Sequence, residues 1–224
     1  MDLDGWEGSP PPSLANPALL REPPATERGV RTRASLIAAA RAVFERVGYL
    51  DARLADITAE AKCSTGTFYL YFKNKEEIFA AVLAVAEEEM RHPGMGRVAD
   101  TGDPYAVLAA SNRAYLETYR RNAKLMALLD QVANIDPAFQ RLRRRRAQAF
   151  IDRNARGIAD LQKRGLADPD LDPELTSRAL SMMVSRVAFS TLALDEGGPP
   201  DFDHLVDTLT RIWANALRFP DHRG

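Results

Sequence analysis

The chain has a single cysteine, Cys63, among its 224 residues, and it has no long apolar run. One cysteine excludes an internal disulfide framework and fits a reducing compartment. A helix needs about 20 consecutive apolar residues to cross a bilayer, and no segment offers them. The N-terminus also lacks the charged-then-apolar pattern of a signal peptide. These absences predict a cytoplasmic protein with no membrane partner.

Ligands for a metal and groups for catalysis are also scarce. The three histidines, His92, His204 and His222, stand far apart, without the spacing of metal ligands, and no second cysteine could join them. No glycine-rich phosphate loop and no nucleophile elbow are present. We therefore expect no metal site and no cofactor, and an enzyme is the least favoured class of function.

The charge is balanced overall but unevenly distributed. The formal net charge is −1, and 46% of the residues are hydrophobic, which is enough for a sizeable core. Residues 28–75 hold nine Lys and Arg against four Asp and Glu, a net charge of +5. Residues 1–27 sum to −4 and contain six of the fourteen prolines. The composition predicts a disordered tail over residues 1–27, followed by a basic block.

Apolar periodicity predicts helices throughout the rest of the chain, with no convincing strand. A first helix spans about residues 31–48. Two short helices follow. Asp51 is the candidate N-cap of the first of them, and Ser64 or Thr65 is the candidate N-cap of the other. A fourth helix is expected from 75 to about 91. The later helical patterns lie at residues 104–121, 123–133, 137–165, 173–195 and 201–218. The fold class is therefore all-α, with about nine helices.

The segment Ile57–Lys75, which reads ITAEAKCSTGTFYLYFKNK, carries the functional signal. It resembles the DNA-binding signature of the TetR family, and the match extends upstream through residues 39–44 and 48–49. The resemblance implies a helix-turn-helix DNA-binding domain over residues 28–75. It also implies a larger helical domain over residues 76–224 that binds an effector and dimerises, with the helix from 75 to about 91 connecting the two.

The physics of a recognition helix agrees with this resemblance. Such a helix offers small or polar groups to the major groove at its N-terminus, while apolar residues on its other face anchor it. Phe68 and Phe72, four residues apart, suit the anchoring face. Hydroxyl and lysine side chains suit contacts to phosphates and base edges. The predicted DNA-binding residues, most of them implied by the resemblance, are Arg53, Thr58, Ser64, Thr65, Gly66, Thr67, Tyr69, Tyr71 and Lys75.

Two positions depart from the family pattern. The turn reads Lys62-Cys63, where the family commonly has Gly followed by Val. A left-handed conformation at Lys62 would cost about 1 kcal/mol relative to glycine. Arg53 stands where many members have Thr, so a hydroxyl contact to a phosphate would become a charged one. We interpret Cys63 as a small apolar turn residue, with a redox sensor as the alternative.

In the C-terminal half, the resemblance implies a ligand pocket and a dimer interface formed by the last two long helices. For both sets of candidates, ordinary core packing is the alternative. The pocket candidates are Tyr115, Tyr119, Leu125, Met126, Leu129, Phe150, Met182 and Phe189. The interface candidates are Leu180, Met183, Val184, Val187, Phe189, Leu192, Leu209, Ile212, Trp213 and Leu217.

One charge run also needs an interpretation: Arg141 and the four consecutive arginines Arg143–Arg146. Four consecutive residues point around a whole helical turn, so they cannot all line one site. A solvated or salt-bridged face is the first interpretation. An anion-binding patch or a second DNA contact is the alternative.

The sequence therefore predicts a homodimeric regulator that binds double-stranded operator DNA and a small molecule, with a repressor released by an apolar effector as the leading form. A ligand-independent regulator or an activator on the same fold remains the alternative. A protein-interaction adaptor that has lost DNA binding is a third class, against which the intact motif from Thr65 to Lys75 argues.

Overall fold

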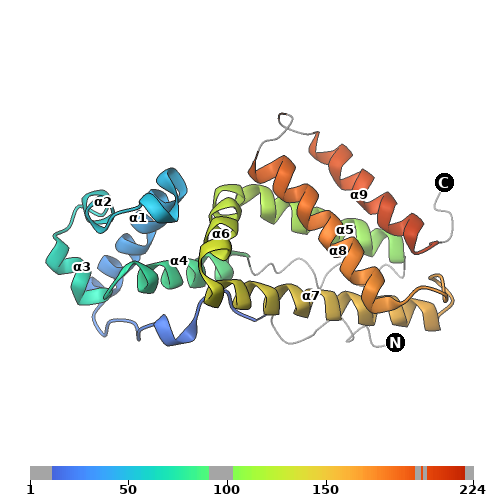
Figure 1. The fold of residues 1–224 in the computed structure, drawn as a ribbon, viewed down its shortest axis with the longest axis horizontal. Helices are drawn as coiled ribbons and strands as arrows, with labels where there is room; N and C mark the ends of the chain where they lie inside the picture. Colours follow the sequence, from blue (N-terminus) through green and yellow to red (C-terminus); the bar gives the residue numbers. More distant parts are fainter. Residues whose placement is uncertain (1–11, 91–102, 195–197, 199–200, 220–224) are drawn as a thin grey trace. The chain divides into compact units, whose positions relative to one another are not determined.

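A computed structural model describes residues 12–90, 103–194, 198 and 201–219. Within these ranges the chain is helical and contains no strand (Figure 1). None of the described helices is both long and apolar enough to cross a membrane. The chain divides into two compact units. The helix-turn-helix unit comprises residues 12–91 and 128–146. The C-terminal unit comprises the remaining residues, described here over 103–127, 147–194, 198 and 201–219.

The helix-turn-helix unit contains four helices of its own and parts of two others. Its helices are α1 (Glu27–Asp51), α2 (Leu54–Glu60), α3 (Thr65–Tyr71) and α4 (Lys75–Met90), preceded by the 3₁₀ turn η2 (Pro17–Leu19). The end of α6 (Ala123–Ile135) and the start of α7 (Pro137–Lys163) complete it. The predicted division at residue 75 placed α4 and these two segments in the other domain, whereas contacts group them with α1 to α3.

Local capping explains where these helices begin. The Thr26 hydroxyl accepts a hydrogen bond from the Gly29 amide at 3.1 Å and starts α1. Gly48 has a φ of 80°, which breaks the helical path three residues before α1 ends, as its place in the sequence predicts. The Asn74 side chain accepts from the Glu77 amide at 2.9 Å at the start of α4. The predicted cap of α2 was wrong, because Asp51 is the last residue of α1 and the N-cap is Arg53.

The core of this unit is formed by apolar side chains from all four helices. Phe44 of α1, Ile57 of α2, Phe68 of α3 and Ile78 of α4 are each at most 1% exposed. The Phe44 and Phe79 rings meet edge to face, with their centroids 5.6 Å apart. Such buried aromatic pairs fix the angles between short helices that could not persist alone.

The segment before α1 corrects the prediction of a disordered tail for residues 12–26. Ala15 is fully buried and Leu14 is 5% exposed. The Ser13 hydroxyl donates to Glu87 Oε2 of α4 at 2.6 Å, and the Leu14 amide donates to Glu87 Oε1. Arg21 forms an ion pair with Glu77 at 3.1 Å. We call residues 12–26 the N-terminal strap. Residues 1–11 of the predicted tail lie outside the described residues.

The C-terminal unit is a helical layer built around one core. Its own helices are α5 (Pro104–Arg121), α8 (Pro173–Ala188) and α9 (Phe202–Ala216), and a π-helical turn, η4 (Phe189–Ala193), continues α8. Asp103, Asp172 and Asp201 cap the three helices by accepting backbone hydrogen bonds. These bounds agree closely with the predicted helical segments. The core of the unit includes Leu116, Ile158, Leu180, Val184, Leu209, Trp213 and Leu217.

The arginine run of α7 is partly paired within the helix-turn-helix unit. Arg143 forms an ion pair with Asp130 at 2.9 Å, and Arg146 with Glu87 at 2.9 Å. Arg146 also donates to the carbonyl oxygen of Pro12 at 3.0 Å. The other three arginines, Arg141, Arg144 and Arg145, are exposed. The run is therefore divided between salt-bridged and solvated positions, as its first interpretation held.

Candidate DNA-binding site

The turn between α2 and α3 is tight because Lys62 adopts the left-handed conformation. Its φ is 53°, so Lys62 takes the left-handed conformation considered in the sequence analysis for a lysine in place of the family's glycine. The Lys62 amide donates to the carbonyl of Ala59 at 3.1 Å, and the Cys63 amide donates to that of Thr58 at 3.0 Å. These bonds satisfy the last carbonyls of α2. The strain at Lys62, about 1 kcal/mol, is therefore accommodated by a fully bonded turn.

Helix α3 is held in place at both its start and its inner face. Ser64 caps it, because its hydroxyl oxygen accepts a hydrogen bond from the Thr67 amide at 3.1 Å. Phe68 is fully buried and Phe72 is 2% exposed, with their ring centroids 5.8 Å apart. The anchoring role predicted for these two phenylalanines is thus confirmed. A seven-residue helix would not persist in water without such packing.

The outer face of α3 presents small, polar and apolar groups together. Ser64, Thr65 and Gly66 are exposed, and Tyr69 is 53% exposed. Leu70 is 75% exposed, the highest value among the large apolar side chains of the described residues. Sequence reasoning missed Leu70, although its position four residues after Gly66 places both on one helical face. An apolar side chain on a helix otherwise suited to DNA is a candidate for contact with thymine methyl groups.

Two of the predicted DNA-contact residues instead form hydrogen bonds to carbonyl groups of the chain itself. Thr58 is 5% exposed, and its hydroxyl donates to the carbonyl of Ala55 at 3.0 Å. The Lys75 ammonium donates to the carbonyls of Tyr49, Leu50 and Ala52 at 2.7, 3.2 and 3.2 Å. An ammonium has three donors, so a phosphate would have to compete with these carbonyls for Lys75.

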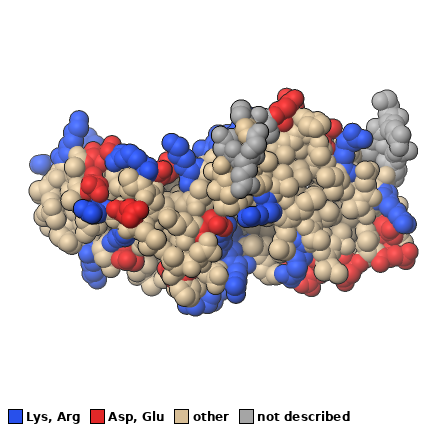
Figure 2. All heavy atoms as spheres, turned by 45° about the horizontal axis from the view of Figure 1, so that its top comes forward, with Lys and Arg blue, Asp and Glu red and all other residues tan. Residues whose placement is uncertain are grey.

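The remaining predicted positions differ in their exposure. Arg53 is exposed at the start of α2, where its backbone amide donates to Asp56 Oδ2 at 3.3 Å. Thr67 and Tyr71 are partly buried. The space-filling view shows Lys and Arg at several points over the helix-turn-helix unit, at the left, with Asp and Glu between them (Figure 2). This surface therefore mixes both signs of charge.

Cys63 lies in the turn beside this face. It is a free thiol, and it is partly buried. Burial raises the pKa of the Cys63 thiol, which disfavours the reactive thiolate. This direction supports the interpretation of Cys63 as an apolar turn residue over that of a redox sensor.

Comparison with known families identifies both halves of the chain. Residues 36–82 match the model described as bacterial regulatory proteins of the tetR family. Residues 108–218 match the model of the C-terminal domain of the transcriptional regulator EthR. The chain belongs to the TetR family of transcriptional regulators. Members of this family bind operator DNA, dimerise and bind small-molecule effectors.

Individual TetR-family relatives align over most of the chain. The HTH-type transcriptional regulator EthR of Mycolicibacterium smegmatis is 24% identical and covers 82% of this chain and 85% of its own length. The A-factor receptor protein of Streptomyces griseus is 26% identical and covers 88% of this chain and 66% of its own length. Among solved structures, a TetR-like regulator from Rhodococcus sp. RHA1 superposes with a TM-score of 0.67 at 24% identity, covering 88% of this chain and 99% of that one.

The fatty acid degradation regulator FadR from Bacillus halodurans also superposes with a TM-score of 0.67, at 19% identity. It covers 84% of this chain and 97% of its own. These structural likenesses show that the all-helical TetR fold predicted from the sequence is correct.

The predicted effector-binding residues are dispersed. Tyr119 and Leu125 are buried, and Met126 and Phe189 pack against the core of the C-terminal unit. Tyr115 is 41% exposed, with its ring centroid 5.9 Å from that of Tyr119. The other three are Leu129, buried in the helix-turn-helix unit, Phe150, half-buried, and Met182, 60% exposed. Their role in ligand binding stays a prediction.

Arg153 of α7 is a polar residue in the C-terminal unit that sequence reasoning missed. Its Cζ lies 5.0 Å from the centroid of the Phe150 ring. Its Nε is buried without a hydrogen-bond partner, and burial lowers the pKa of the guanidinium. A buried guanidinium nitrogen without a hydrogen-bond partner is costly unless a ligand atom completes it. No sequence pattern distinguishes Arg153 from the other arginines of α7.

Proposed function

We propose that this TetR-family protein is a dimeric repressor whose α3 helices enter successive major grooves of an operator and which a small apolar effector releases. The observation that carries the proposal is the outer face of α3, where Thr65, Gly66, Tyr69 and Leu70 are exposed on a helix fixed by a buried Phe68 and Phe72. A rigid helix with free small and apolar groups is what base-edge recognition requires.

Dimerisation is supported by apolar side chains that the C-terminal unit leaves exposed. On α8, Leu175, Ala179 and Met182 are exposed at spacings of four and three residues, which places them in one stripe. On α9, Ile212 is 42% exposed. Half of the ten interface candidates from the sequence pack inside one chain: Leu180, Val184, Leu209, Trp213 and Leu217 are at most 8% exposed. The proposed dimer face therefore uses the exposed sides of these helices.

Release by an effector is supported by the C-terminal half. It matches the C-terminal domain of EthR, and one relative is named as the A-factor receptor protein. The apolar side chains of the C-terminal unit suit an apolar ligand, and Arg153 suits an anionic group on it. A ligand shifts the DNA-binding equilibrium by its difference in affinity for the two conformations and by no more.

Mobility-shift titrations with DNA flanking the gene test the DNA-binding part. Specific retention is expected, and its association constant should fall steeply as salt rises, with a log–log slope near −0.9 per phosphate contacted. Tyr69→Ala should weaken specific binding, whereas Tyr115→Ala, the same change at an exposed tyrosine of the C-terminal unit, should leave it unchanged. Equal binding by both variants and the wild type would contradict the placement of α3 in the groove.

Transcription from the same promoter fragment tests the repressor part. Added protein should lower transcript levels in a purified system, and ligand extracted from the protein should restore them. A rise in transcription on adding protein would instead establish an activator. If no extracted or added small molecule changes the retention of DNA, the effector is removed from the proposal.

A further inference from the structure

The helix-turn-helix unit contains a groove between the N-terminal strap, α1 and α4. Its volume is about 270 Å³, close to the lower end of the ~300–1,000 Å³ typical of small-molecule sites. The lining residues are Pro23, Pro24, Val30, Arg33, Ala34, Ile37, Ala38, Arg41, Val82 and Val85. Eight of these ten are apolar, and the polar two are both arginines.

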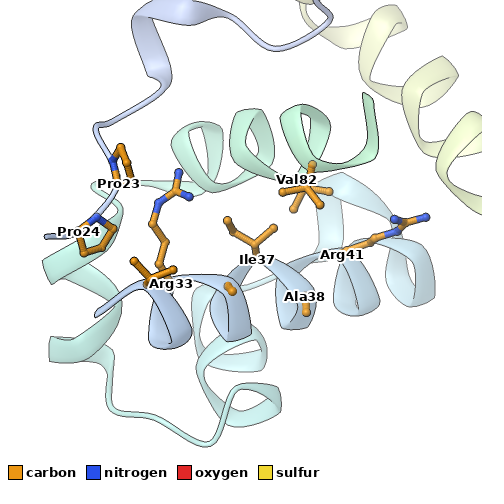
Figure 3. Close-up of a pocket in the computed structure, with 10 residues that line it drawn as sticks. Pro23, Pro24, Arg33, Ile37, Ala38, Arg41 and Val82 are labelled. Carbon is orange, nitrogen blue, oxygen red and sulfur yellow. The ribbon is translucent and has the colours of Figure 1, made fainter. Parts of the chain in front are cut away.

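The groove remains open to a ligand although its lining is apolar. Val30 is 47% exposed and Val85 is 42% exposed. Ile37 and Val82 point toward one another from α1 and α4 (Figure 3). Apolar side chains exposed on facing helices are stabilised when an apolar group covers them, by roughly 25 cal/mol per Å² removed from water.

The two arginines at the groove are not equivalent. Arg41 is paired with Glu45, with Nε 2.8 Å from Oε1. Arg33 stands beside the two prolines, with its side chain rising from α1 (Figure 3). Its Nε is buried without a hydrogen-bond partner, although its Cζ lies 5.4 Å from the Phe72 ring centroid. Burial lowers the pKa of the Arg33 guanidinium, as expected for a cation that is partly removed from water.

Pro23 and Pro24 form one wall of the groove, and the surrounding contacts hold them in place. A Cβ on Gly29 would lie 2.8 Å from Pro24 Cβ, so the strap approaches α1 as closely as a glycine allows. The strap is also fastened on either side of this point, by the ion pair from Arg21 to Glu77 and by the Thr26 cap of α1. The prolines are thus held over the Arg33 end of the groove.

We propose that this groove binds a small amphipathic carboxylate, with its carboxylate on Arg33 and its aliphatic part along the exposed Val30, Ala34 and Val85. The planar guanidinium fork matches a carboxylate, and the volume suits a short chain better than a helix or a long lipid. The site lies within the DNA-binding half, and it is separate from the effector site proposed for the C-terminal unit. Its existence does not depend on DNA binding.

Calorimetric titration of the full-length protein with sodium octanoate tests the proposal, with 1-octanol as the uncharged counterpart. Arg33→Gln should weaken octanoate binding by on the order of tenfold to a hundredfold and should leave octanol binding unchanged. Arg41→Gln is the matched control at the same groove and should bind octanoate within about twofold of the wild type, because Arg41 is already paired. Arg153→Gln is the control for the other desolvated arginine.

Localisation by methyl NMR completes the test. Octanoate should give intermolecular contacts to the methyl groups of Val30 and Val85, and Ala34→Trp, at an exposed helical position, should abolish them. The proposal is overturned if octanoate does not bind, if Arg33→Gln binds as the wild type does, or if Arg153→Gln or Arg41→Gln causes the larger loss. Failure of the proposed function would appear instead in the DNA titrations, which this measurement does not use.

Discussion

At the scale of single residues, Gly66 is a position where the fold itself does not require a glycine. A Cβ placed on Gly66 meets only the Ser64 hydroxyl oxygen, at an ordinary contact distance of 3.6 Å, and the residue lies inside the regular helix α3. The fold therefore does not need a glycine there. Close approach of DNA to the α3 backbone would account for a glycine at this position.

We therefore expect Gly66→Ala to change stability and DNA binding in opposite directions. The unfolding free energy in urea should rise by about 0.4–1 kcal/mol, because the unfolded chain loses freedom that glycine provides. Operator affinity should fall by at least about tenfold, since a methyl group would separate the helix from the duplex by more than a contact permits. A variant that is both more stable and equally tight on DNA would show that nothing approaches α3 at this point.

Leu70 offers a second test at this scale, because contact with a thymine methyl group would explain its exposure. If Leu70 packs against a thymine, replacing that thymine by deoxyuridine removes the methyl and should weaken binding by about 1 kcal/mol. Leu70→Ala should weaken binding to the normal operator and should be insensitive to the same replacement. Titrations of both proteins on both DNAs form a double-mutant cycle, and additive effects would mean that Leu70 contacts no thymine methyl.

At the scale of elements, the positions of helices were predictable where capping and periodicity are local. Ser64 begins α3 through its own hydroxyl, and Gly48 breaks α1 through its own φ. The directions of Thr58 and Lys75 were not predictable, because burial of Thr58 and the three carbonyls around Lys75 arise from packing of α1 against α2 and α4. A motif fixes a position in the chain, whereas tertiary contacts decide which way its side chain points.

The N-terminal strap shows that composition, like a local motif, does not predict long-range contacts. Prolines and acids predict disorder when no partner is known, yet the N-terminal end of the strap is held by a buried carboxylate, Glu87, which is 5% exposed. Glu87 accepts hydrogen bonds from Ser13 and Leu14 and pairs with Arg146, whose side chain is 19% exposed. Nothing local to the strap indicates that α4 carries this acceptor 73 residues away.

We expect Glu87→Ala to destabilise the protein by about 2–4 kcal/mol, because it leaves Arg146 and the strap donors without their partner in a mostly buried place. Trypsin should then cleave after Arg21 faster than in the wild type, since the strap is released. Glu60→Ala is the matched control: its pair with Arg46 is exposed, at 41% and 55% for the two side chains, and should contribute under about 1 kcal/mol. Equal losses for the two variants would contradict the role of Glu87.

At the scale of the whole molecule, the proposed DNA recognition requires a second copy of the chain, because one helix-turn-helix module buries too little surface for tight specific binding. Two α3 helices must be spaced by about one duplex turn, ~34–36 Å, and only the dimer contact can set that spacing. The exposed stripe of α8, centred on Met182, and the exposed Ile212 of α9 are the side chains available for this contact.

Met182→Glu combined with Ile212→Glu should therefore yield a folded monomer. Sedimentation velocity should show half the mass of the wild type. The unfolding free energy of that monomer should differ little from that of an isolated wild-type subunit, because both residues are exposed within one chain. Leu209→Ala should behave oppositely, losing about 2–5 kcal/mol of stability from the core with the dimer contact intact. Since the monomer keeps α3 unchanged, its operator affinity should fall to the level of non-specific binding, and any retained specificity would mean that one copy suffices.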